Sequence, residues 1–292
     1  MSGVGLVLDK YDAGLEYLSA EAPLDDIIYL IKCDGGVVLR SLISHEELDK
    51  TYDEIKDRMD KDTEWDGEFF PTRNFQAVCA ELLTTRTTYW WGGKRKESVS
   101  KPYLTSGVAI EIGPGAKAQP LHCDSYLYHR EVSAIDEWDN ERDRNREVSI
   151  GLCVAGCRVT SENGGTQFIP GSHLWASTRA EPPALEDTIT PTLEKGDAFL
   201  MLTSVLHGGG ANTTTDQRRL VYFNFAVRGF LRQEKNQYLA VPRDIARQYD
   251  RATQQFMGYY ISEPACGHVH QVDPIYVLNP ELKGIDEKPK DF

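Results

Sequence analysis

The sequence has 292 residues, of which 40% are hydrophobic and 26% are charged. These proportions are typical of a folded globular protein and exclude a chain that is disordered, collagen-like or a coiled coil throughout. Lys and Arg number 32 against 45 Asp and Glu, so the net charge is −13, which disfavours binding to nucleic acid and to anionic membranes.

The first residues do not indicate export. Segment 1–14 lacks a basic region and soon contains Asp9 and Asp12, so we expect no signal peptide. No apolar run reaches the roughly 18 residues that a membrane span needs. The six cysteines are scattered and include no CxxC pair, which indicates neither a disulfide framework nor a structural zinc site. We therefore expect a cytoplasmic protein.

Helical signals come first along the chain. Residues 24–32 have the apolar spacing of a helix, and residues 35–43 follow a glycine turn and have the composition of a strand. Residues 44–47 (Ser-His-Glu-Glu) form a capping-box pattern, which predicts the start of a second helix.

The middle of the chain is rich in β-branched and aromatic segments that turn residues separate. Four of these segments occupy residues 103–112, 147–156, 197–206 and 219–227. Many short strands with helices gathered at the ends predict a mainly β fold, with a barrel or sandwich core and flanking α-helices. The charged stretch 135–146 is expected to be an exposed loop. No linker-like stretch divides the chain, so we expect a single domain over 1–292.

Two histidines and one aspartate form the most informative polar pattern. His122 and Asp124 are two residues apart, so on extended backbone their side chains point the same way. His207 ends a long apolar run and precedes three glycines, which makes it the candidate for a third ligand from a distant strand. Two histidines and one carboxylate on one face of an ion are typical of non-haem Fe(II) oxygenases. The alternative is that both histidines are hydrogen-bonded residues of the barrel.

An arginine pair follows at the start of the last strand segment. Arg218 comes 11 residues after His207. Strand alternation places it on one face with Leu220, Tyr222 and Asn224, and places Arg219 on the other face with Val221, Phe223 and Phe225. The first set mixes polar and aromatic groups, which is expected of a wet barrel mouth, whereas the second indicates packing. A guanidinium in that mouth suits a bidentate grip on a dicarboxylate. The alternative is two surface arginines in an edge strand.

Five segments in a fixed order extend this pattern over most of residues 24–245. They are GGVVLRSLISHEEL near the start, QPLHCD at 119–124, SENGGTQFIPGSH at 161–173, GDAFLMLTSVLHGGGAN at 196–212 and RRLVYFNF at 218–225. In this order they resemble the phytanoyl-CoA dioxygenase (PhyH)-like Fe(II)/2-oxoglutarate oxygenases, and most closely the fungal members that tailor meroterpenoids and alkaloids.

The resemblance implies a double-stranded β-helix, which is a jelly-roll or cupin-like core, over about residues 24–245. It implies Fe(II) held by His122, Asp124 and His207, with O2 as the oxidant. It also implies that Arg218 anchors 2-oxoglutarate and that Gln119 occupies a position that hydrogen-bonds this cosubstrate.

Three further residues are weaker candidates. Arg73, in the segment FPTRNF, is predicted to help neutralise the cosubstrate. Tyr222 shares the predicted face of Arg218, and Trp90 belongs to the aromatic run at 89–91. Each of these two aromatic residues is expected either to line a substrate pocket or to pack in the core. The tail after about residue 245 is predicted to act as a lid or as a dimer contact.

The resemblance also implies a reaction and a class of substrate. The reaction is oxidation of an unactivated C–H bond by hydroxylation, desaturation, rearrangement or endoperoxide formation. The substrate is an apolar, polycyclic secondary metabolite, a fungal meroterpenoid or alkaloid. Fungal relatives further imply a homodimer. Two alternatives stay open: a catalytically inactive jelly-roll binding protein, and a zinc hydrolase that uses the same three ligands.

Overall fold

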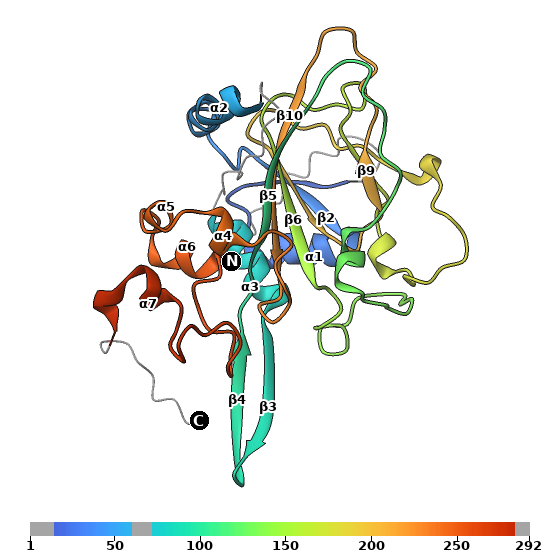
Figure 1. Cartoon of the computed structure of the whole chain (residues 1–292). Coiled ribbons are helices and arrows are strands. Elements are labelled where there is room, and N and C mark those ends of the chain that lie inside the picture. The colour runs from blue at the N-terminus through green and yellow to red at the C-terminus, as the bar shows by residue number, and fades with distance from the viewer. Residues whose placement is uncertain (1–14, 60–71, 284–292) are drawn as a thin grey trace, which may run out of the picture. The chain divides into compact units, whose positions relative to one another are not determined.

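The computed structural model describes residues 15–59 and 72–283 (Figure 1). Contacts between Cα atoms divide the chain into two compact units, residues 1–82 with 107–225 and residues 83–106 with 226–292. The single domain expected over 1–292 stays a prediction beside this division. Segment 1–14, on which the expected absence of a signal peptide depends, lies outside the described residues.

The first unit is built around a six-stranded sheet with the strand order β1-β2-β8-β6-β10-β5 (Figure 1). The strands are β1 (Tyr17–Ser19), β2 (Gly36–Arg40), β5 (Tyr103–Ile112), β6 (Ser149–Ala155), β8 (Ala198–Leu202) and β10 (Arg219–Val227). β1 pairs with β2 in parallel, whereas β8 pairs antiparallel with both β2 and β6. The four segments that the composition marked as strands therefore all contribute to this sheet.

A small second sheet packs on one face of the large one. Its strands β7 (Thr166–Phe168) and β9 (His207–Gly209) are antiparallel, with Phe168 opposite His207. The ring of Phe168 contacts that of Phe199 in β8, with 4.7 Å between the ring centroids, and both side chains are buried. The predicted fold class is confirmed: the chain is mainly β, with a jelly-roll core and flanking helices.

The flanking helices of the first unit are α1 (Leu24–Asp34), α2 (His45–Met59) and α3 (Arg73–Leu83), with the short 3-10 turns η1 (Asp124–Tyr128), η2 (Ser172–Leu174) and η3 (Leu185–Asp187). The helices expected near 24–32 and after residue 44 are thus present. α1 packs against β2 and β8, and every residue of β6 and β8 is buried. The central strands of the large sheet are therefore buried on both faces.

Gly35 ends α1 in a conformation that favours glycine. Its φ is +83°, and its N–H donates to the carbonyl of Ile31 at 2.9 Å. A Cβ at this position would overlap Val205 and would lie 2.8 Å from Nδ1 of His173. A residue with a side chain here would therefore meet both backbone strain and a clash.

The second unit contains a β-hairpin and a set of short helices. The hairpin consists of β3 (Thr85–Trp91) and β4 (Lys94–Ser100); the helices are α4 (Gln237–Ala240), α5 (Arg243–Ala246), α6 (Arg251–Phe256), α7 (Ile275–Leu278) and the 3-10 turn η4 (Pro280–Leu282). A small core forms around Met257, Tyr259 and Ile275. Trp90 is 73% exposed in β3, which contradicts packing in the core, and its role in a substrate pocket stays a prediction.

No helix in the described parts of the chain combines the length and the apolar character that a membrane crossing requires. The segment 135–146 is an irregular loop as expected, although Asp143 and Arg146 near its end are buried.

Candidate metal centre

Backbone pairing brings the two predicted histidine ligands side by side. His122 and His207 form an antiparallel bridge in which each residue's N–H donates to the other's carbonyl, both at 2.8 Å. Directly opposed residues of such a pair project their side chains to the same side. The two imidazole rings accordingly lie close together, with 4.7 Å between their centroids. Residues 85 positions apart in the sequence thus share one site because of a strand register.

Each imidazole is oriented by a hydrogen bond from its outer nitrogen. Nδ1 of His122 is 2.8 Å from the carbonyl oxygen of Pro120, and Nδ1 of His207 is 2.9 Å from that of Val205. A carbonyl oxygen only accepts, so Nδ1 carries the proton in both rings. In the neutral imidazole the lone pair is then on Nε2. Second-shell carbonyls of this kind fix the tautomer of metal-binding histidines.

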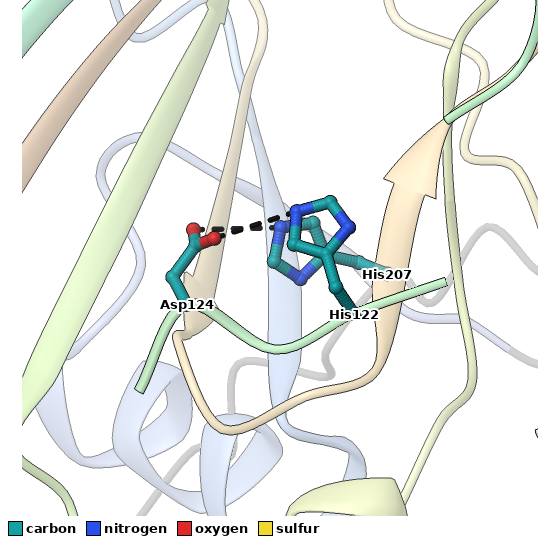
Figure 2. Close-up of side chains that lie close together, drawn as sticks. All are labelled: His122, Asp124 and His207. Atoms are coloured by element: carbon teal, nitrogen blue, oxygen red, sulfur yellow. Dashed lines mark ion pairs between the residues drawn. The ribbon is translucent and has the colours of Figure 1, made fainter. Parts of the chain in front are cut away.

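The Asp124 carboxylate faces both free ring nitrogens (Figure 2). Its Oδ1 is 3.4 Å from Nε2 of His122, and its Oδ2 is 3.5 Å from Nε2 of His207. The ligand atoms of the three residues all lie within 4.8 Å of one another. The aspartate opens η1 directly after the extended residue Cys123, which allows it to turn toward the histidines.

The electrostatics of this cluster suit a cation. Two Nε2 lone pairs and a carboxylate are all acceptors, so they repel one another unless a proton or a metal ion lies between them. The hydrogen bond with Asp124 raises the pKa of His122 despite its partial burial. Burial opposes ionisation of Asp124, but hydrogen bonds from the two imidazoles, when Nε2 is protonated, outweigh it and hold the pKa of this carboxyl well below its usual range. The donor set fits Fe(II) or another divalent transition metal.

Arg218, directly before β10, and Arg219, the first residue of β10, point in opposite directions, but not in the directions that the sequence suggested. Arg218 is on the surface, where its side chain is 64% exposed and its guanidinium donates to Glu111. Arg219 is 4% exposed. Its Nη2 lies 3.8 Å from the position that a Cβ on Gly209 would take. Since Gly209 is two residues after His207 in β9, Arg219 and not Arg218 points into the interior that holds the histidines.

The buried guanidinium of Arg219 has an unsatisfied donor. Its Nε has no hydrogen-bond partner among the described residues. Burial lowers the pKa of Arg219, and the nearby thiols of Cys153 and Cys157 only partly oppose this effect. A buried cation with a free N–H is costly unless an anion joins it, so this group is suited to a carboxylate ligand.

Gln119 lies against the same glycine from the other side. The side-chain carbonyl of Gln119 accepts from the N–H of Gly209 at 2.8 Å. The backbone N–H of Gln119 donates to the Gly209 carbonyl, also at 2.8 Å. A Cβ on Gly209 would be 3.1 Å from Gln119 Oε1. The glycine therefore leaves a small space between Gln119 and Arg219, and the amide nitrogen of Gln119 remains available as a donor.

The remaining candidates are placed differently. Tyr222 is 2% exposed and packs with Leu220 against Gly156. It lies on the face opposite Arg219, so its side chain does not point toward the two histidines. Arg73 begins α3 with an exposed side chain, and its role stays a prediction. His173 is buried, and its Nε2 donates to the Lys32 carbonyl at 3.0 Å, as expected of a structural residue.

Comparison with known proteins identifies the family. A sequence model described as phytanoyl-CoA dioxygenase (PhyH) matches residues 31–220. The chain is 33% identical over 305 residues to the dioxygenase himG of Aspergillus japonicus, covering 94% of this chain and 93% of that protein. It is 30% identical over 293 residues to the dioxygenase peniF of Penicillium patulum, covering 93% and 94%. The chain belongs to the phytanoyl-CoA dioxygenase (PhyH) family.

One solved structure supports the fold independently. The non-haem monooxygenase ThoJ, in its apo form, is similar with a TM-score of 0.50 at 15% identity, over 73% of this chain and 80% of that one. Membership of the PhyH family makes this chain a 2-oxoglutarate-dependent dioxygenase, with Fe(II), 2-oxoglutarate and O2 as its cofactors. The His-Asp-His cluster is the part of the structure that fits the metal.

Proposed function

We propose that His122, Asp124 and His207 bind the Fe(II) ion and that Arg219 binds the far carboxylate of 2-oxoglutarate. The observation that carries this proposal is the meeting of three acceptor groups within 4.8 Å, on backbone that also positions a buried, unsatisfied guanidinium. Gln119 is the second cosubstrate residue, since its amide nitrogen is free to donate. This assignment replaces Arg218, whose guanidinium is exposed and paired with Glu111.

When bound, the iron and 2-oxoglutarate supply the oxidising chemistry: one atom of O2 enters succinate as CO2 leaves, and the other oxidises a C–H bond of the substrate. The protein's residues perform the remaining tasks. The carbonyls of Pro120 and Val205 hold the imidazoles in the tautomer that presents Nε2. Arg219 orients the cosubstrate through a bidentate grip.

We further propose that the substrate is a small secondary metabolite with an apolar, polycyclic body, of the meroterpenoid or alkaloid class. The similarity to dioxygenases of Aspergillus japonicus and Penicillium patulum along nearly the whole chain supports a fungal tailoring reaction. Hydroxylation, desaturation, rearrangement and endoperoxide formation all begin by attack on an unactivated C–H bond, so one site is suited to each of them.

The test is release of succinate from 2-oxoglutarate with iron-loaded protein, in the presence of panels of polycyclic terpenoids, alkaloids, sugars and amino acids. We expect terpenoids or alkaloids to stimulate release and His122→Ala to abolish it. His45→Ala is the matched control, because His45 is exposed and its ring hydrogen-bonds the Lys195 carbonyl, away from the metal-binding cluster. Retained turnover in His122→Ala would refute the ligand assignment. Stimulation by sugars or amino acids alone would refute the substrate class.

The same preparation decides between the oxygenase and its rivals. Iron content together with 2-oxoglutarate consumption supports the oxygenase. Tight binding of zinc, with hydrolysis that does not depend on 2-oxoglutarate, would support a zinc hydrolase instead. A protein that binds the substrate panel but releases no succinate would be an inactive binding protein.

A further inference from the structure

The first unit contains a cavity of about 420 Å³ that the proposed reaction does not use. Its volume is within the range of roughly 300–1,000 Å³ that is typical of small-molecule sites. The walls come from four separate parts of the chain, namely residues 123–132, 146–147, 172–183 and 204–206. All of these lie within one compact unit of the fold.

The cavity adjoins the metal-binding segment but is separate from the metal centre. Cys123 and Ser125, which flank Asp124 in the sequence, line it, and so does Leu206, which precedes His207. The side chains of the three metal-binding residues do not line it. A molecule in this cavity would therefore contact the residues next to the ligands without touching the ion.

Three arginines converge on this cavity in a protein that is otherwise acidic. Arg130, Arg146 and Arg179 all line it, although the chain carries a net charge of −13. Within residues 15–59 and 72–283, none of the three is in an ion pair with a carboxylate. Like charges that converge without a counter-ion are costly, so their arrangement favours an anionic occupant.

Two of the three arginines are held by contacts other than ion pairs. Arg146 is buried and donates to the carbonyls of Ser133, His173 and Trp175, at 2.8 to 3.2 Å. Burial lowers the pKa of Arg146, and the negative charges of Glu147 and Asp143 partly oppose this effect, whereas the positive charge of Arg130 adds to it. The guanidinium of Arg179 lies over the ring of Trp175, 4.3 Å from its centroid.

Two acidic side chains also line the cavity, and one of them, Glu147, offsets part of the positive charge of Arg146. Glu147 is 1% exposed and accepts from the hydroxyl of Ser204 at 2.6 Å. Glu181 is exposed to solvent. The lining therefore carries three positive and two negative groups, with the two arginines other than Arg146 exposed and able to reach a ligand.

We propose that this cavity binds an organic carboxylate with an apolar body. Arg130 and Arg179 contact the carboxylate, because a guanidinium pairs with it through two parallel hydrogen bonds. The hydrocarbon part packs against Val132, Trp175 and Leu206, which form the apolar part of the lining. The site is a second small-molecule site, beyond the one that holds iron and 2-oxoglutarate.

The test uses the full chain loaded with Fe(II) and 2-oxoglutarate under nitrogen, so that the metal centre is occupied. The probes are 2-naphthoate and its neutral analogue 2-naphthamide, titrated by calorimetry. We expect the acid to bind about tenfold more tightly than the amide, and Arg130→Gln/Arg179→Gln to remove that difference. Lys50→Gln/Lys56→Gln is the matched control, because it removes two positive charges from the exposed face of α2.

Three results would overturn the proposal. The first is equal affinity for acid and amide, and the second is an equal loss of affinity in the lysine control, which would indicate only the field of the whole protein. The third is binding of 2-naphthoate to the iron-loaded protein that 2-oxoglutarate abolishes, since the probe would then occupy the cosubstrate site. Binding that survives in metal-free His122→Ala supports the separate cavity, even if the assignment of that residue to iron fails.

Discussion

The proposal that Arg219, and not the neighbouring Arg218, binds 2-oxoglutarate can be tested by matched substitutions. Arg219→Gln and Arg218→Gln remove the same charge from adjacent positions. Arg219 is 4% exposed and has a free Nε, whereas the Arg218 side chain is 64% exposed and pairs with Glu111. We expect only Arg219→Gln to weaken binding of 2-oxoglutarate.

The expected magnitudes follow from these environments. Truncating one partner of a buried, hydrogen-bonded charge pair costs about 2–5 kcal/mol, which corresponds to a rise in Kd of about 30-fold to several thousandfold. Removing an exposed ion pair costs about 0–1 kcal/mol, so the Kd of Arg218→Gln should stay within about fivefold of the wild-type value. Without 2-oxoglutarate, Arg219→Gln should unfold no more easily than the wild type, because a buried charge without a full set of partners has been removed.

The assay is calorimetric titration of 2-oxoglutarate into Fe(II)-loaded protein under nitrogen, with thermal unfolding of each variant measured with and without the cosubstrate. A saturating ligand should raise the Tm of the wild type and of Arg218→Gln, but not that of Arg219→Gln. The reasoning would be refuted if Arg218→Gln lost as much affinity as Arg219→Gln, or if Arg219→Gln bound within threefold of the wild type.

Three further outcomes follow from the geometry. Burial lowers the pKa of His173 to about 4, below the ordinary value near 6.5. Between these two pH values the unfolded chain binds a proton that the folded chain does not. The free energy of unfolding should therefore fall by up to about 3 kcal/mol as the pH drops from about 6.5 to 4. Urea unfolding measured across this pH range should show a weaker dependence of stability on pH for His173→Gln than for the wild type. An unchanged dependence would contradict the lowered pKa of His173. Gly35→Ala combines a φ of +83° with a clash against Val205, so it should lower the free energy of unfolding by about 2–4 kcal/mol, and a loss below 1 kcal/mol would show that the helix end relaxes. Gln119→Leu leaves the Gly209 N–H without its 2.8 Å acceptor and should raise the Kd of 2-oxoglutarate about fivefold; no change would remove Gln119 from the cosubstrate site.

The sequence predicts the fold and the metal cluster because both depend on strong local signals. The segments that became β5, β6, β8 and β10 are dense in β-branched and aromatic residues, and helices α1 and α2 begin where the apolar spacing and the capping box predict. The pattern at residues 122 and 124 also restricts the third ligand to a distant histidine. The bridge between His122 and His207 then supplies the register that no sequence pattern can reveal.

The structure places Arg218 on the surface and Arg219 in the interior, the reverse of what the sequence suggested, and the difference has a physical reason. Alternation separates Arg218 from Arg219 correctly, but it does not say which face of β10 points inward. A polar residue on one face usually marks solvent, yet β10 is covered on this face too, so Leu220, Tyr222 and Asn224 are buried without lining the site. The small glycines of β9, which leave room for Arg219, are the signal that favours the correct face.

Two other features could not be predicted from the sequence and were found only in the structure. The run at 89–91 is aromatic, but its partner strand β4 begins Lys-Arg-Lys-Glu, so the hairpin presents Trp90 to solvent. The arginine-lined cavity comes from four segments that are distant in the sequence, and nothing in any one of them indicates that they meet.

The most direct test of the whole account is a crystal structure of the protein grown under nitrogen with Fe(II) and 2-oxoglutarate. The account predicts one ion bound by Nε2 of His122, Nε2 of His207 and the carboxylate of Asp124, with the far carboxylate of the cosubstrate on Arg219. An ion bound elsewhere, or a cosubstrate carboxylate that contacts Arg218, would contradict it.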